Sequence, residues 1–167
     1  MDTELAQQML NLRDGDHLCL FYDKDPAEQM PALVPFIHDA LTKDERFIYI
    51  ADDQTVDELV ARLELGGVDV GNQVGRGALK LWTRQEWRQS GRLSSDNKAA
   101  QVLDLVGTAA NAGFKGVRFA VEMTWTLGPD IDVSDYLQRW LLRNVVARQL
   151  TLVLSVRRPC PLNSIRA

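Results

Sequence analysis

The sequence has few cysteines, no long apolar run and no excess of basic charge. Of its 167 residues only Cys19 and Cys160 are cysteines, so a disulfide framework is not expected. No uninterrupted apolar run approaches the roughly 18 residues that a membrane-spanning helix needs, and the N-terminus is acidic where a signal peptide is basic. The formal charge is −4, and no block of five like charges occurs, which disfavours direct nucleic-acid binding. We therefore expect a cytoplasmic protein whose partners include neither a membrane nor a nucleic acid.

Common catalytic motifs are missing as well. The sequence contains neither a G-x-S-x-G elbow nor an H-E-x-x-H pair. Segment 21–26, Phe-Tyr-Asp-Lys-Asp-Pro, follows the first expected strand and contains no glycine, so we expect no backbone amide cradle for a phosphate there. The acidic residues of this segment would also repel a triphosphate. These absences predict a protein that is not an enzyme, and the sequence identifies no cofactor.

Short apolar runs alternate with capped amphipathic stretches along the whole chain. The runs predict buried strands at 17–22, 46–51, 78–82, 117–123 and 150–156. Helical spacing of apolar residues follows at 26–41, 55–65, 95–112 and 136–145, and residues 1–13 form an expected N-terminal helix. Strands that are apolar on both faces require helices on both sides of a parallel sheet. We therefore predict a single α/β domain over 1–167, a three-layer sandwich with a mainly parallel five-stranded sheet.

In an open parallel sheet, ligands bind beyond the carboxyl ends of the strands. The residues expected at these ends to bind a ligand are Tyr22, Asp52, Glu122, Trp125 and Arg157. Glu122 is the most informative, because a carboxylate in an apolar central strand must be paired or face a ligand. It either lies in a pocket beside Asp52 and Arg157 or forms an internal ion pair with Arg118 or Arg157. In the first case Glu122→Ala abolishes ligand binding and leaves the fold intact.

His17 and Cys19 lie two residues apart in the first strand, so their side chains share one face. They could form a metal or redox site, with His38 as a third ligand. The structural alternative is that Cys19 is a small buried apolar residue and His17 a hydrogen-bonded residue at the start of the strand.

Several segments together resemble one family, the MEDS domain, a methanogen/methylotroph DcmR-type sensory domain. These segments are 16–22 (DHLCLFY), 33–37 (LVPFI), 45–53 (ERFIYIADD), 77–81 (GALKL), 113–118 (GFKGVR) and 121–125 (VEMTW). The resemblance implies a RecA/KaiC-like fold with a degenerate nucleotide loop and a role in prokaryotic signal transduction. It also implies that His17, Cys19, Glu122 and Trp125 correspond to characteristic residues of the family. The segment 155–160 departs from the Tyr-Asp-Arg type usual in relatives, and we expect either that the domain signals by contact with another protein or that it belongs to a longer chain.

Three functions follow from these observations. The first is a sensory domain that binds a small molecule, such as a simple hydrocarbon derivative, and changes a partner surface. The second is a scaffold that forms a homo-oligomer or docks on a kinase or transcription regulator, with Trp82, Trp87 and Trp140 as exposed anchors. The third is a metal or redox sensor that uses His17 and Cys19.

Overall fold

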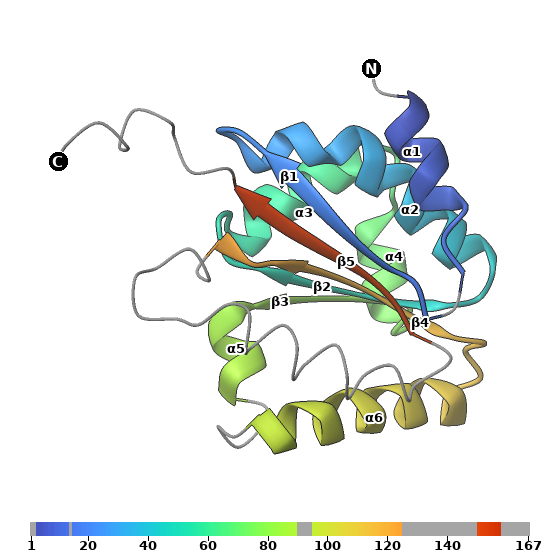
Figure 1. Cartoon of the computed structure of the whole chain (residues 1–167). Coiled ribbons are helices and arrows are strands. Elements are labelled where there is room, and N and C mark those ends of the chain that lie inside the picture. Colours follow the sequence, from blue (N-terminus) through green and yellow to red (C-terminus); the bar gives the residue numbers. More distant parts are fainter. Residues whose placement is uncertain (1–2, 14, 90–94, 125–149, 158–167) are drawn as a thin grey trace, which may run out of the picture.

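The computed structural model describes residues 3–13, 15–89, 95–124 and 150–157 and shows an α/β fold (Figure 1). Its strands are β1 (His17–Tyr22), β2 (Arg46–Ala51), β3 (Leu79–Thr83), β4 (Val117–Glu122) and β5 (Leu150–Arg157). Its helices are α1 (Thr3–Leu10), the 3-10 turn η1 (Pro26–Gln29), α2 (Met30–Thr42), α3 (Val56–Leu65), α4 (Val70–Gly75), α5 (Arg84–Gln89) and α6 (Ser95–Asn111). The expected helix at 136–145 lies outside the described residues.

The strands form one sheet in the order β1-β5-β4-β2-β3, and every neighbouring pair is parallel. The α/β class and the parallel sheet predicted from the sequence are therefore confirmed. Because all strands run in one direction, their carboxyl ends meet at the same edge of the sheet. This edge is where the ligand site was predicted.

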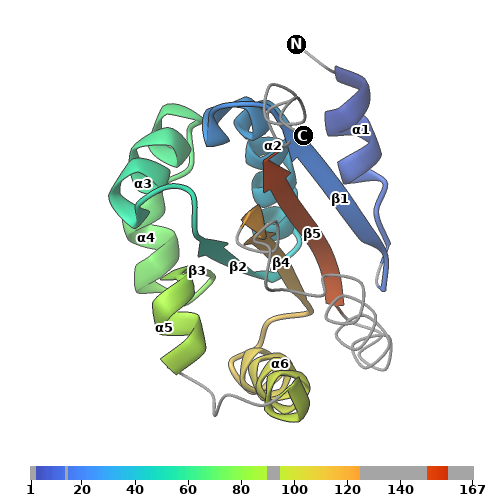
Figure 2. The same cartoon turned by 60° about the vertical axis from the view of Figure 1, so that its left-hand side comes forward.

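Helices cover the sheet on two faces (Figures 1 and 2). On one face α1, α2, α3 and α4 bury a core with Phe36, Phe47 and Leu63 among its members. On the other face α5 and α6 pack Trp87 and Val102 against strand residues such as Phe119. The alternation of side chains along β2 and β4 supplies both cores, since successive residues of a strand point to opposite faces.

Local sequence signals explain the boundaries of several helices. Asp25 caps η1 and forms a capping box with Glu28, and Thr55 forms one with Glu58 at the start of α3. The helix expected to begin at Pro26 instead begins as a 3-10 turn, and α2 continues through Pro35. Helix α4 was not predicted, because the Gly66-Gly67 pair before it indicated only the end of α3.

The expected exposure of the tryptophans is wrong for Trp87. Its side chain is buried, stacks on Trp82 at 5.8 Å between ring centroids and contacts the Phe119 ring at 6.3 Å. Trp82 is half-buried against the same core, and Trp140 lies outside the described residues. Trp87 is therefore a core residue, because α5 turns its apolar side onto the sheet.

Replacing Trp87 by Ala should lower the free energy of unfolding by about 3–5 kcal/mol, the usual result of removing a large core ring. The control is Leu65→Ala, since Leu65 is 89% exposed; it should change stability by less than about 0.5 kcal/mol. Urea denaturation followed by circular dichroism measures both. Equal stability of Trp87→Ala and the wild type would contradict the core assignment.

Candidate functional site

Polar side chains gather where β1, β2 and β4 end. Tyr22 is the last residue of β1, Asp52 and Asp53 follow β2, and Glu122 is the last residue of β4. These positions are distant in sequence and adjacent in space because the strands are parallel. We call Glu122 and its hydrogen-bond donors the carboxylate hub, and we call Tyr22, Asp53 and Thr124 the tyrosine cluster.

The carboxylate hub consists of Glu122 and the groups that donate hydrogen bonds to it. Glu122 is fully buried. Its Oε2 accepts bonds from the backbone amides of Asp52 and Asp53, both at 2.7 Å. Its Oε1 accepts bonds from three side chains, which are Tyr49 Oη at 2.8 Å, Gln29 Nε2 at 3.3 Å and Gln54 Nε2. Neutral donors therefore replace the water that the carboxylate loses on burial.

The side chains that donate to Glu122 also form hydrogen bonds with one another. Both Gln29 and Gln54 additionally donate to the Tyr49 hydroxyl, at 3.1 and 3.3 Å. Burial and the adjacent Glu122 charge hold the pKa of Tyr49 well above its usual value, so this hydroxyl remains a donor. The amide orientation of Gln29 is set by Glu122, and this leaves the buried Gln29 Oε1 without a hydrogen-bond partner among the described residues.

Of the two ion pairs considered for Glu122, the one with Arg118 is wrong, and the side chain of Arg157 lies outside the described part. Arg118 lies near the amino-terminal end of β4, where it pairs with Asp39 at 2.8 Å and Glu45 at 2.5 Å. Its guanidinium also lies over the Phe36 ring. Arg118 therefore stabilises the amino-terminal side of the sheet, while Glu122 is held by neutral groups at the carboxyl-terminal side.

The tyrosine cluster consists of Tyr22, Asp53 and Thr124. The Tyr22 hydroxyl bonds to Asp53 Oδ2 and lies 3.3 Å from Thr124 Oγ1, which donates to the same Asp53 oxygen at 2.8 Å. Burial and the Asp53 carboxylate raise the pKa of Tyr22. The three residues come from the ends of three strands, so the cluster connects β1 to β2 and β4.

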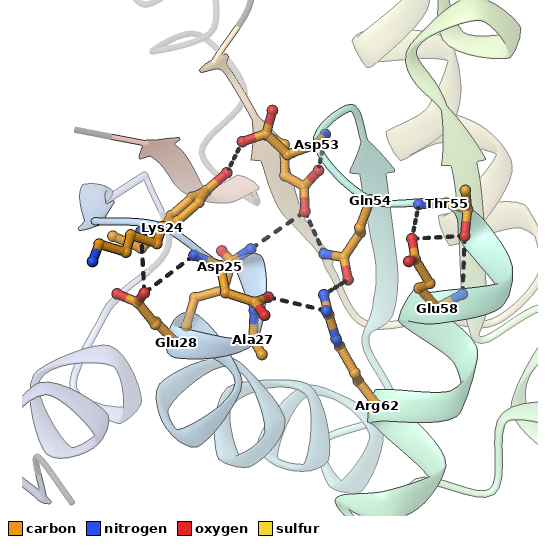
Figure 3. A network of polar contacts seen from close by, with 12 residues as sticks. Lys24, Asp25, Ala27, Glu28, Asp53, Gln54, Thr55, Glu58 and Arg62 are labelled. Carbon is orange, nitrogen blue, oxygen red and sulfur yellow. Dashed lines mark hydrogen bonds and ion pairs between the residues drawn. The ribbon is translucent and has the colours of Figure 1, made fainter. Parts of the chain in front are cut away.

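A chain of polar contacts leads from the hub to the loop after β1 (Figure 3). Gln54 Oε1 accepts a bond from Arg62 at 2.6 Å, and Arg62 pairs with Asp25 at 3.0 Å. On the other side of the hub, the Asp52 carboxylate pairs with Arg84 at 3.3 Å. The loops after β1, β2 and β3 are thus connected through side chains of this edge.

The loop after β1 forms an amide cradle without any glycine, and its acceptor is a side chain of the chain itself. The backbone amides of Asp23, Lys24 and Asp25 donate to the Glu28 carboxylate at 3.0 to 3.1 Å (Figure 3). These bonds hold the pKa of Glu28 below its usual value. The cradle is occupied by an anion of the chain itself, so the amides that would bind a phosphate already have an acceptor.

Residues 16–156 match the family model described as MEDS, MEthanogen/methylotroph, DcmR Sensory domain. The chain belongs to this family. The resemblance noted in the sequence is therefore confirmed, and with it a sensory role in general terms.

Solved structures show the fold of this MEDS domain. One similar structure is the KaiC-like protein PH0186 from the hyperthermophilic archaeon Pyrococcus horikoshii OT3, with a TM-score of 0.59 and 14% sequence identity. The match covers 87% of this chain and 62% of that one, so the chain spans less than two thirds of its length. The expected KaiC-like fold is confirmed by this likeness. A comparison with curated protein sequences gives no match.

The predicted site residues of this MEDS domain fall into three groups. Glu122, Asp52 and Tyr22 come together at the strand ends, but Glu122 is enclosed by protein donors instead of lining an open pocket. Arg157 ends β5 in register with Tyr22, and its side chain lies outside the described part. Trp125 also lies outside it.

Sequence reasoning missed several participants of the site: Gln29, Tyr49, Asp53, Gln54, Arg62, Arg84 and Thr124. Asp53 could have been found, because it follows β2 directly beside Asp52. Tyr49 carries a weaker signal, since it is the polar-tipped residue of an apolar strand. Nothing in the sequence marks Gln29 or Arg62, because their roles depend on how helices pack over the sheet.

The structural interpretation of Cys19 as a buried residue is wrong, since its side chain is exposed on β1. His17 on the same strand is half-buried, and burial lowers its pKa. His38 lies on α2, where Nε2 is 3.3 Å from the Gly66 carbonyl oxygen. Within the described residues no group of three or more His, Cys, Asp or Glu side chains could hold a metal ion. No helix of the described part is long and apolar enough to span a membrane.

Replacing Glu122 by Gln should destabilise this MEDS domain by about 3 kcal/mol or more, because the new amide group would face donors and leave buried groups unpaired. The geometry thus changes the expectation that a Glu122 variant keeps the fold intact. The control is Glu64→Gln, because Glu64 is exposed on α3. Chemical denaturation checks both variants, and an unchanged unfolding midpoint for Glu122→Gln would contradict the hub.

The cradle around Glu28 predicts a pH-dependent contribution to stability. Because its folded-state pKa is lowered, Glu28 stabilises the fold above its unfolded-state pKa of about 4.3, and this contribution is lost as the pH falls through the folded-state value. The melting temperature of Glu28→Gln should therefore be below that of the wild type near neutral pH, and the difference should shrink as the pH falls below the unfolded-state pKa. Thermal melts from pH 7 to pH 3 measure this difference, with Glu64→Gln as the control. A difference that is constant across this range would show that the cradle does not hold a charged carboxylate.

Proposed function

We propose that this chain is a non-enzymatic small-molecule sensory domain of a prokaryotic signal transduction or transcription-control system. Its ligand binds at the carboxyl edge of the sheet, next to the tyrosine cluster and Asp52. Trp125 and Arg157 remain predicted contributors to this site. Membership of a family of sensory domains supports the general role, and the described edge supports the location.

The observation that carries this proposal is the tyrosine cluster. Tyr22, Asp53 and Thr124 connect the ends of three parallel strands by hydrogen bonds at the edge where ligands of open α/β sheets bind. Their polar atoms can exchange bonds with a ligand more readily than Glu122, since the contacts among them are only partly buried and Glu122 is enclosed. The hub is thus a support for the site, and the half-buried Asp53 and Thr124 of the cluster offer the contact surface, while Tyr22 is buried.

The negative charge of this edge, and the Glu28 carboxylate bound to the loop amides, favour a ligand other than a nucleotide. Glu28 occupies the amides of the first loop, and a phosphate there would have to displace it. Asp23, Asp25 and Asp53 add negative charge at the ends of β1 and β2, which repels phosphate groups. A neutral or cationic small molecule that donates hydrogen bonds fits these acceptors better.

The network also offers a way to convert binding into a change of the surface. A ligand that shifts Asp53 also shifts the backbone next to Gln54, whose side chain contacts Arg62. Arg62 in turn holds Asp25 in the loop after β1. Binding that favours a different arrangement of these contacts would change the loop and so the surface offered to a kinase or transcription regulator.

Native mass spectrometry of the protein purified from its own host tests the proposal. The wild type should show a mass excess that disappears on denaturation. Asp53→Asn should weaken ligand binding about tenfold or more and so lower the fraction of loaded protein, because it removes a charged acceptor of the cluster. The loss of a single charged hydrogen bond at a binding site justifies this magnitude.

Asp57→Asn is the matched control, because Asp57 is an exposed aspartate at the start of α3. This variant should retain the mass excess. A mass excess that Asp53→Asn leaves unchanged would place the ligand elsewhere, and an excess equal to one or more further protein chains would favour the scaffold function.

A further inference from the structure

The two edges of the sheet differ in how well they are protected. Strands β1 and β3 are the outer strands, so each has one side on which no described strand pairs with it. An edge strand exposes backbone donors and acceptors, and proteins usually protect such edges with charges, prolines, short length or covering elements.

Strand β3 shows this protection. It has five residues, its second residue is Lys80, and it contacts both α4 and α5. The Lys80 ammonium lies 5.5 Å from the centre of the Trp82 ring, so a positive charge stands on the strand. These features oppose the addition of another strand at the β3 edge.

Strand β1 carries neither a charged residue nor a proline, and no strand of the described part pairs with its outer side. Its sequence is His-Leu-Cys-Leu-Phe-Tyr, without a Lys, Glu, Asp or Pro. Leu20 and Tyr22 are buried, whereas Cys19 is exposed and Phe21 is 56% exposed. Within the described residues, the outer strand therefore combines an unpaired backbone edge with exposed apolar side chains, a combination suited to strand addition.

The charges at the two ends of β1 indicate what kind of strand would pair with it. Asp16 precedes the strand and Asp23 follows it directly, before Lys24 and an Asp25 that is already paired with Arg62. Antiparallel pairing with β1 of a second copy, in the register that joins all six residues, would place Asp16 opposite Asp23 at both ends. Like charges directly opposite each other destabilise a strand pair. A partner strand with basic residues at both ends would place opposite charges there instead.

We propose that the outer edge of β1 is a docking site for a partner protein segment, which adds as a β-strand with an apolar centre and Lys or Arg at both ends. Main-chain hydrogen bonds supply affinity in this mode, and flanking charges supply selectivity. Because Tyr22 is both the last residue of β1 and a member of the tyrosine cluster, the docking strand is connected directly to the strand-end site. The docking site itself does not depend on a ligand at that site.

Fluorescence anisotropy with synthetic peptides tests the proposal on the full chain. The probe is a labelled Val-Thr-Val-Thr-Val peptide with two Arg at each end, and its matched twin carries two Asp at each end. The basic peptide should bind saturably and at least about tenfold more tightly than the acidic one, and this preference should decrease with salt. Hydrogen exchange should show added protection of the amides of residues 17–22.

Two variants and a control assign any binding to the β1 edge. Cys19→Lys and Phe21→Lys place a charge at exposed positions of β1 and should each weaken binding of the basic peptide by about tenfold or more. Leu103→Lys adds the same charge at an exposed position of α6 and should leave binding unchanged. Two independent β1 variants keep the test valid if one of them fails to fold.

Three results would overturn the proposal. The first is no saturable binding of the basic peptide, which would mean that the edge does not accept a strand. Equal affinity for both peptides would reject the basic partner. Light scattering that shows a dimer of the full chain, abolished by Cys19→Lys, would identify a second copy as the occupant.

Discussion

A buried carboxylate determines the arrangement of the carboxyl edge of this sheet. Glu122 stands at the end of a central strand, where no water reaches it, and an unpaired charge there would cost several kcal/mol. Two backbone amides after β2 and three side chains satisfy it instead. The path of the chain after β2, and the placement of Gln29 and Gln54, are therefore consequences of a single charge.

This dependence explains which parts of the molecule the sequence could predict. Strands β1 and β2 were located to the residue, because buried parallel strands are continuous apolar runs and capping boxes mark the helices between them. The position of Glu122 near a strand end was also predictable. Its partners were not predictable, since no sequence pattern marks neutral donors such as Gln29. An ion pair with Arg118 would also have satisfied the need of a buried carboxylate for a partner.

The loop after β1 shows that backbone amides can converge on an anion in a segment that lacks the glycines of a phosphate-binding motif. Glycines are absent after β1, and three amides nevertheless converge on one anion. Backbone amides need an acceptor wherever they converge, and a glutamate three residues after Asp25 supplies it from the same chain. The loop after β1 can thus gather three amides around an anion without any glycine, because a side chain of the same chain is the acceptor.

Tyr22 brings these constraints together. Its hydroxyl lies in the tyrosine cluster, while its backbone belongs to the outer strand of the sheet. Asp53 links the same residue to the hub, because its carboxylate bonds to Tyr22 and its amide donates to Glu122. A displacement of Asp53 by a few tenths of an ångström must either stretch the bond to Tyr22 or move the end of β1. Since packed interiors transmit such shifts instead of absorbing them, ligand binding at the proposed site would move the strand at the proposed docking edge.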